Sequence, residues 1–442
     1  MHKTSRSFLF LLLVLFLLHS LSKIQGLPQQ NSISPIDLSA LQQIENSLTD
    51  VPSSRAPPSA RFFTSWDFSS HDPCSTFAGI TCSSPFLNPR RLTSLILGTG
   101  LSGSLGLAGS LSPSISNLTE LNQLVLNPGI VTGPIPAQLG SLRNLRVISL
   151  TNNRLTGSIP LSIYALPNLH TLDLSNNQLW GSIPPGISHL DQLKVLVLAS
   201  NRLSGEIPNE LPTQLLHLDL KNNFFSGTLP ARMPLSIRYL SASGNSMWGP
   251  LNRLESLSEL VYLDISMNRF SGTIPPSLFR SSLLSMLLQR NNLSGGVPQQ
   301  KNTTTPLSSS SSSSSSLKLD FYGEGSIVDL SHNMLTGELP AGAFSGVETL
   351  FLNNNRFTGK VPKEYVESLY SGGTKTLYLQ HNYLTDFPII SDLKLPDSVS
   401  VCLSYNCMVP PVGLTACPAS AGEQLSRPAY QCSKFNNGGS TG

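Results

Sequence analysis

The chain has 442 residues, and only 12% of them are Asp, Glu, Lys or Arg. Its formal net charge of +3 comes from the first 26 residues, which carry three basic side chains and no acidic one, so the remainder is neutral. A neutral chain has no overall field that concentrates nucleic acid or anionic membrane, and we therefore exclude most proteins that bind either. The hydrophobic content of 39% nevertheless predicts a folded core.

The amino terminus predicts secretion. Lys3 and Arg6 precede an unbroken apolar run over residues 8–18, and small residues follow it up to Gly26. This layout is typical of a signal peptide, here residues 1–26, and the run is too short for a membrane span of about 20 residues. No other stretch approaches that length, and the polar carboxy-terminal tail lacks a glycolipid-anchor signal. We therefore expect a secreted protein with no membrane span.

The six cysteines lie near the two ends of the chain. An even number in a secreted chain predicts disulfides, because the spacing lacks the paired Cys-x₂-Cys knuckles and the nearby histidine of a zinc site. Cys74 and Cys82 form the local pair at the front. The last four leave three connectivities open: Cys402, Cys407, Cys417 and Cys432. Three sequons predict N-glycosylation in this compartment, at Asn117, Asn292 and Asn302.

Between the cysteine clusters one sequence frame recurs twelve times, with a central apolar residue running from Leu95 to Leu377. Alternation such as Leu172-Asp173-Leu174 predicts a short, half-buried strand. Each coil is too small to bury its own apolar face, so we expect the coils to stack around one shared core. The position five residues after the central residue is asparagine in ten coils: Asn153, Asn177, Asn201, Asn223, Asn245, Asn268, Asn291, Asn333, Asn355 and Asn382.

An inward asparagine needs partners, because an unpaired buried polar group costs about 1–3 kcal/mol. The ten positions therefore predict a repeated hydrogen-bond network between coils. The frame breaks once, over residues 299–324, where nine consecutive serines follow a polar stretch. We expect this low-complexity insertion to form a flexible loop.

The full repeat, LxxLxxLxLxxNxLxGxIP, is clearest over residues 166–184 and ends in Gly-x-Ile-Pro at 157–160, 181–184, 205–208 and 272–275. It resembles the plant-specific extracellular class of leucine-rich repeat. The helical spacing of Leu38, Leu41 and Ile44, followed by Trp66 and the first cysteine pair, resembles the amino-terminal cap of the same proteins. The resemblance implies an α/β solenoid: a right-handed leucine-rich repeat superhelix of about twelve plant-type coils with disulfide-stabilised caps.

The expected organisation follows from this resemblance. Residues 27–90 form the amino-terminal cap, residues 91–388 the repeats, and residues 389–442 the carboxy-terminal cap and tail. The Gly-x-Ile-Pro segments should add a second, irregular layer of strands. The compartment implied is extracellular, in the cell wall or at the outer face of the plasma membrane.

We find no motif for catalysis, cofactor binding or metal binding in this repeat pattern. The match to Gly-x-Gly-x-x-Gly at 98–103 continues into another turn rather than a crossover helix, so we reject a dinucleotide site. Asp173, Asp219, Asp264 and Asp329 share one outward slot on separated coils, which gives no close carboxylate pair. The outward histidines have no obvious nucleophile or metal partner. We predict no enzyme activity, no cofactor and no metal, and the chain contains no kinase segment.

A concave surface remains, where parallel strands would present their outward residues in columns. Coils five to eight place apolar and aromatic residues there with single charges, which resembles the centre of an interface. The predicted ligand-binding residues are Val195, Val197, His217, Asp219, Lys221, Tyr239, Tyr262 and Asp264. Phe351 and Tyr378 form a second, smaller candidate. The alternative is that these residues only pack against their lateral neighbours.

Two functions are compatible with these patterns. The chain resembles the kinase-less leucine-rich repeat receptor-like proteins of plants, which bind a peptide or protein ligand and depend on the ectodomain of a leucine-rich repeat receptor kinase for output, in development or defence. It departs from them in lacking a membrane span. It is also similar to the secreted polygalacturonase-inhibiting proteins, which block cell-wall-degrading enzymes of pathogens, but it has more coils and only one amino-terminal cysteine pair. We favour the receptor-like function.

Overall fold

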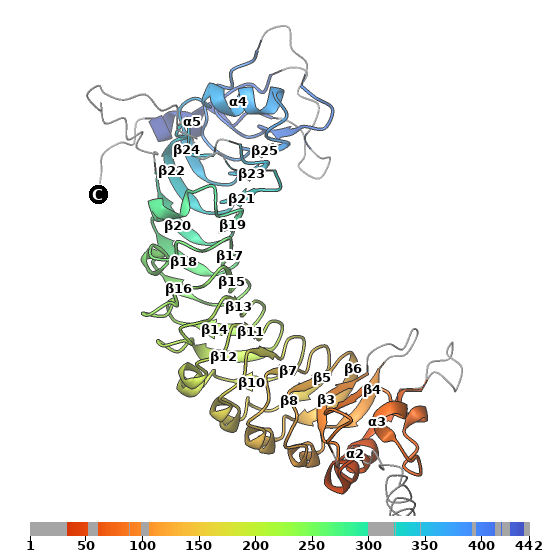
Figure 1. Ribbon diagram of the computed structural model, residues 1–442. Coiled ribbons are helices and arrows are strands. Elements are labelled where there is room, and N and C mark those ends of the chain that lie inside the picture. The colour runs from red at the N-terminus through yellow and green to blue at the C-terminus, as the bar shows by residue number, and fades with distance from the viewer. Residues whose placement is uncertain are drawn as a thin grey trace, which may run out of the picture.

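The computed structural model describes residues 33–51, 61–87, 89–98, 106–298, 322, 324–344, 346–390, 395–411, 417 and 425–436. The predicted signal peptide, Asn302 and nearly all of the serine-rich insertion lie outside these residues, as do two glycines of the rejected dinucleotide motif. The described chain forms a curved solenoid whose inner side is one continuous sheet (Figure 1).

That inner sheet has fourteen strands, of which thirteen are parallel, because only β2 pairs with its neighbour antiparallel. The central apolar residues of successive coils pair in register, as Ile148, Leu172 and Leu196 do. Its strands are β2 (Ile80–Cys82), β3 (Leu92–Leu97), β5 (Gln123–Leu126), β7 (Val147–Ser149), β9 (Thr171–Asp173), β11 (Val195–Val197), β13 (His217–Asp219), β15 (Tyr239–Ser241), β17 (Tyr262–Asp264), β19 (Ser285–Leu287), β21 (Ile327–Asp329), β23 (Thr349–Phe351), β25 (Thr376–Tyr378) and β26 (Ser400–Cys402).

A second layer of strands lies on the outer side of the inner sheet (Figure 1), as the Gly-x-Ile-Pro segments predicted. It consists of β1 (Leu48–Asp50), β4 (Leu107–Ser110), β6 (Gly129–Pro134), β8 (Arg154–Thr156), β10 (Trp180–Gly181), β12 (Arg202–Glu206), β14 (Phe224–Ser226), β16 (Trp248–Gly249), β18 (Arg269–Gly272), β20 (Asn292–Gly295), β22 (Met334–Glu338) and β24 (Arg356–Thr358).

Short 3₁₀ helices complete many of the coils: η3 (Pro113–Asn117), η4 (Ala137–Ser141), η5 (Leu161–Ala165), η6 (Pro185–His189), η7 (Asn252–Leu254) and η8 (Pro276–Leu278). The helix α4 (Lys363–Tyr370) takes this place in a later coil. The leucines, isoleucines and phenylalanines between the layers form one core that runs the length of the solenoid. Fully buried side chains such as Phe225, Phe270 and Phe357 fill it.

The asparagine network is present at all ten predicted positions. In Asn201, Nδ2 donates to the carbonyls of Leu174 (2.9 Å), Leu198 (3.1 Å) and Ala199 (3.2 Å). Its Oδ1 accepts from the backbone N–H of Leu179 at 3.0 Å. The residue before each of these asparagines has a positive φ, which turns the chain out of the strand, and in one coil that residue is a glycine.

The sequence analysis missed one coil. The strand β26 continues the parallel sheet, with Val401 opposite Leu377, so there are thirteen parallel strands rather than twelve. Asn406 follows Val401 by five residues, is fully buried and extends the asparagine network: its Nδ2 donates to the Leu379 carbonyl, and its Oδ1 accepts from the Leu384 N–H. The repeat therefore runs further into the carboxy-terminal region than expected.

The amino-terminal cap covers the first strand of the solenoid. It contains α2 (Pro35–Ser47), η2 (Phe62–Ser65) and α3 (Pro73–Thr76), and a disulfide joins Cys74 to Cys82. The buried carboxylate of Asp37 accepts from the Leu92 N–H at 2.7 Å and pairs with the Arg91 guanidinium. These contacts fasten the cap helix to the first strand of the repeats.

The carboxy-terminal cap is fastened by the two other disulfides, Cys402–Cys417 and Cys407–Cys432, which selects one of the three possible connectivities. Arg427 precedes the last helix, α5 (Ala429–Asn436), and its guanidinium lies 4.1 Å from the ring centre of Tyr383. Its Nε also donates to the carbonyl of the network residue Asn382 at 2.9 Å. The segment that ends the chain is thus bound directly to the last coils.

Candidate functional site

The predicted ligand-binding residues lie together on the inner face of the solenoid, on β11, β13, β15 and β17 and the turn after β13. The pairing register places Val195, His217, Tyr239 and Tyr262 in one column. Val197, Asp219 and Asp264 belong to the neighbouring column. Most of these side chains are half-buried, because the strands stand only about 4.8 Å apart and neighbours cover each other's flanks.

Three rings of the first column form a continuous stack. The ring centres of His217 and Tyr239 are 4.0 Å apart with an interplanar angle of 3°, and those of Tyr239 and Tyr262 are 4.4 Å apart at 4°. The rings therefore pack against their lateral neighbours and also leave part of their surface open to the inner face. The next residue in the register after Tyr262 is the small Ser285, so the outer face of the last ring is bounded by a short side chain.

The stack is electrically neutral at physiological pH. Burial lowers the pKa of His217, an effect that the carboxylates of Asp219 and Asp173 oppose. Burial raises the pKa of Tyr239 and Tyr262, and the nearby carboxylates raise both further.

The carboxylates beside the stack differ in their surroundings. Asp219 is only 5% exposed and pairs with the Lys221 ammonium at 3.4 Å, so this outward position is buried. Asp264 instead accepts from the N–H and hydroxyl of Ser266 through Oδ1, as Asp173 does from Ser175. The carboxylates stand on alternate strands, roughly 9.6 Å apart.

Three buried polar atoms of this face have no hydrogen-bond partner in the described part of the chain. The Ser241 hydroxyl lies between Asp219 and Asp264 in the register, in a side chain that is 1% exposed. The Oε1 atoms of Gln289 and Gln380, in later coils, are also buried and unpaired. The sequence analysis selected none of the three residues, although all occupy outward positions of the frame.

The second candidate, Phe351 and Tyr378, also lies on the inner face. The two rings meet edge to face, with centres 5.1 Å apart and an interplanar angle of 69°. The Tyr378 hydroxyl hydrogen-bonds Ser400 on the neighbouring strand β26. This pair is smaller than the three-ring stack, and Asp329 lies opposite Phe351 in the register.

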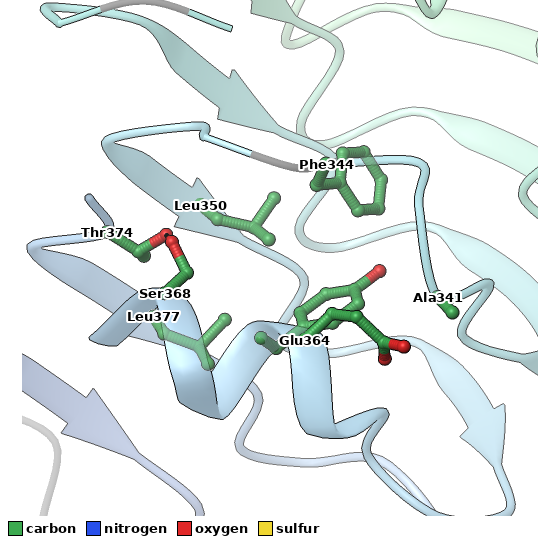
Figure 2. Close-up of a pocket in the computed structure, with 8 residues that line it drawn as sticks. Ala341, Phe344, Leu350, Glu364, Ser368, Thr374 and Leu377 are labelled. Atoms are coloured by element: carbon green, nitrogen blue, oxygen red, sulfur yellow. Dashed lines mark hydrogen bonds between the residues drawn. The ribbon is translucent and has the colours of Figure 1, made fainter. Parts of the chain in front are cut away.

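An open hollow of about 500 Å³ is lined by Leu161, Tyr164 and His189 among others, whereas the enclosed cavity near the carboxy-terminal coils is much smaller. The cavity in Figure 2 lies between α4 and the strands β23 and β25, lined by Phe344, Leu350, Glu364 and Leu377 among others. Its volume of about 10 Å³ holds at most one water molecule. No group of three His, Cys, Asp or Glu side chains that could hold a metal ion occurs among the described residues. The open inner face is the candidate binding surface.

Comparison with known families agrees with this geometry. Residues 34–83 match the leucine rich repeat N-terminal domain, and residues 143–191 match a model of two leucine-rich repeat copies. A single-repeat model matches residues 192–213 and 259–281. Over these residues the chain carries a leucine-rich repeat amino-terminal domain and leucine-rich repeats, in agreement with the solenoid fold. No curated protein matches the chain as a whole or in part.

Solved leucine-rich repeat structures resemble the solenoid as a whole. One is the Arabidopsis receptor kinase HAESA in complex with the peptide hormone IDA and the co-receptor SERK1, at 26% identity and a TM-score of 0.61, with 85% of this chain and 58% of that chain covered. Another is PEPR1–AtPEP1, at 25% identity and a TM-score of 0.53, with 84% and 55% covered. This leucine-rich repeat chain thus spans a little over half the length of these ectodomains.

The fold is that of a leucine-rich repeat binding domain, which is typically non-enzymatic. Every described cysteine is in a disulfide, which is consistent with an extracellular location. No helix in the described ranges combines the length and the apolar character required to cross a bilayer.

Proposed function

We propose that this leucine-rich repeat protein is a secreted or cell-surface-associated binding protein that recognises a peptide or protein ligand on its inner face. It acts with the ectodomain of a leucine-rich repeat receptor kinase in plant signalling. The observation that carries the proposal is the neutral stack of His217, Tyr239 and Tyr262 beside a row of carboxylates, on an open sheet with no enclosed pocket. The HAESA ectodomain, similar in fold, is bound to a peptide hormone and a co-receptor.

The partly exposed carboxylates of the inner face define the ligand's chemistry. Asp173 and Asp264 use Oδ1 for their contacts with Ser175 and Ser266, so Oδ2 of each can accept from a ligand that brings N–H donors. Carboxylates on alternate strands are roughly 9.6 Å apart. A peptide in the polyproline II conformation has three residues per turn and advances about 3.1 Å per residue, so every third side chain lies on the same face about 9.3 Å further along. Basic side chains at every third residue of such a peptide therefore meet successive carboxylates, while apolar residues next to them contact the rings.

Synthetic peptides test this proposal. A twelve-residue peptide with arginines at every third position and apolar residues between them should bind at least ten times more tightly by calorimetry than the same peptide with glutamates. The double variant Tyr239→Ala/Tyr262→Ala should lose most of that binding. A matched control, Phe351→Ala/Tyr378→Ala, removes two aromatic rings from the same sheet and should retain it.

Two results would overturn the proposed site. Equal binding of the arginine and glutamate peptides would remove the carboxylate row from recognition. Loss of binding in the Phe351→Ala/Tyr378→Ala variant alone would place the interface at the second pair of rings. Circular dichroism of both variants verifies that the solenoid remains folded.

A further inference from the structure

The second layer of strands carries exposed aromatic side chains in the middle of the solenoid. Trp180 on β10 is 57% exposed, Phe224 on β14 is 63% exposed and Trp248 on β16 is 54% exposed. These strands lie on the outer side of the coils from the inner sheet (Figure 1). Large apolar groups gathered on one solvent face are characteristic of a surface that is covered by a partner.

The repeat itself shows that the fold does not need these tryptophans. In the ten coils with central residues from Leu124 to Leu350, the slot eight residues after the centre holds Ser or Thr in eight coils. Trp180 and Trp248 occupy it in the other two. The same turn forms with Ser or Thr in the other coils. The tryptophans therefore add exposed apolar area that the coil does not need in order to fold.

Unpaired arginines lie between and beside the aromatic rings. Arg202 is opposite Trp180 in the strand register, and Arg269 is opposite Trp248. Arg154, on β8, occupies the same slot of an earlier coil. All three are exposed, and within the described residues none of their side chains takes part in an ion pair or hydrogen bond. The strand β12 itself ends in an acid, Glu206.

The dimensions suit a protein interface. At about 4.8 Å per coil, Trp180 and Trp248 are roughly 14 Å apart along the solenoid, and Arg154 and Arg269 roughly 24 Å. A standard interface covers about 800 Å² on each partner. Asn292, a predicted glycosylation acceptor, occupies the arginine slot one coil beyond Arg269, so a glycan there would mark the edge of the surface.

We propose that these residues form a lateral docking surface for a second protein, through a patch on that protein with an apolar centre and acidic surroundings. We name it the Trp–Arg surface: Trp180, Phe224, Trp248, Arg154, Arg202 and Arg269. Tryptophan and arginine are the residues that most often dominate protein interfaces, and the arginine fork pairs with carboxylates in a bidentate manner. The Trp–Arg surface thus needs a partner with both apolar area and carboxylates, and a protein surface offers the two together.

The Trp–Arg surface is distinct from the proposed ligand site. It belongs to the second strand layer, whereas the ring stack belongs to the inner sheet, so a peptide and a docked protein can be held at the same time. The surface therefore gives this chain a second point of contact that does not depend on which peptide the inner face recognises.

Site-specific photocrosslinking tests the proposal on the secreted, full-length chain. A photoreactive phenylalanine analogue at Phe224 should crosslink at the plant cell surface to one protein, through a segment rich in Asp or Glu. The same analogue at Thr358, on the second layer five coils further along, serves as the control and should not. The double variant Arg202→Glu/Arg269→Glu should abolish the crosslink. Replacing the mapped acidic residues of the partner by basic ones should restore it.

A second variant separates docking from folding and from ligand binding. Trp180→Ser/Trp248→Ser installs the residue that other coils already use, and it should be secreted normally while binding the mapped partner at least ten times more weakly. Tyr239→Ala/Tyr262→Ala should leave the crosslink intact. The proposal would be overturned by crosslinks to wall polysaccharide or by no crosslink above the Thr358 control. It would also be overturned if the charge reversal failed to restore the crosslink, or if the serine variant bound the partner with unchanged affinity.

Discussion

Replacing Asn201 by alanine tests whether the asparagine network stabilises the solenoid. The backbone N–H of Leu179 is buried, and Asn201 Oδ1 is the acceptor that it has. The carbonyls that Asn201 contacts retain other donors: Asn177 for Leu174 and Asn223 for Leu198. The variant therefore leaves one buried donor unpaired, which costs about 1–3 kcal/mol, and loses further hydrogen bonds worth about 1 kcal/mol.

We expect Asn201→Ala to lower the free energy of unfolding by roughly 2–4 kcal/mol in total. Solenoids can unfold in parts, so the local measurement is hydrogen exchange at the Leu179 amide, which should lose protection first. Asn168→Ala is the matched control, because Asn168 is exposed and its amide makes a single bond to the Arg143 carbonyl. Equal stability of the two variants, or unchanged protection of Leu179, would refute the network's role.

Three other perturbations follow from the structure. Asp37→Ala should destabilise the amino-terminal cap by about 3–5 kcal/mol in urea unfolding, because it leaves the Leu92 N–H and Arg91 without their buried partner. The control is Glu210→Ala, which breaks an exposed ion pair with Arg232 and should cost under about 1 kcal/mol. Cys82→Ser should remove about 2.5 kcal/mol and lower secreted yield; unchanged yield and melting would show that the bridge is not structural. Burial lowers the pKa of His217 below its ordinary 6.5, so the unfolded chain binds more protons than the folded chain as the pH falls through that value, and the folded state loses stability. His217→Phe should therefore reduce the drop in Tm between pH 7.5 and 5.5. An equal drop in Tm for the variant and the wild type would contradict the role of His217.

The regular part of the fold could be predicted because one pattern encodes it many times. Alternating leucines fix the strands and their register, and the buried asparagine fixes the turn, so the inner sheet and its columns were predictable. The strand β26 was missed although Val401, Leu403 and Asn406 obey the frame, because no Gly-x-Ile-Pro segment follows and cysteines dominate that stretch. The pairing of the last four cysteines depends on how the chain folds over the last coils, which spacing alone does not contain.

The candidate site was predictable only in its composition. The register placed His217, Tyr239 and Tyr262 in one column, but the parallel stacking of their rings depends on side-chain rotamers that sequence does not specify. The burial of Asp219 was not foreseen, because the alternation of the strand places it on the outward side. The unpaired Ser241 hydroxyl depends on the three-dimensional surroundings of a common residue, so no sequence signal marked it.

The most direct test of the central claim is affinity capture from plant tissue with the tagged secreted chain, compared with the Tyr239→Ala/Tyr262→Ala variant and analysed by mass spectrometry. The account predicts that the wild-type chain recovers a receptor-kinase ectodomain together with a peptide rich in basic residues, and that the variant loses the peptide. Recovery of polygalacturonases or similar secreted hydrolases, with neither kinase nor peptide, would contradict the account and indicate an inhibitor.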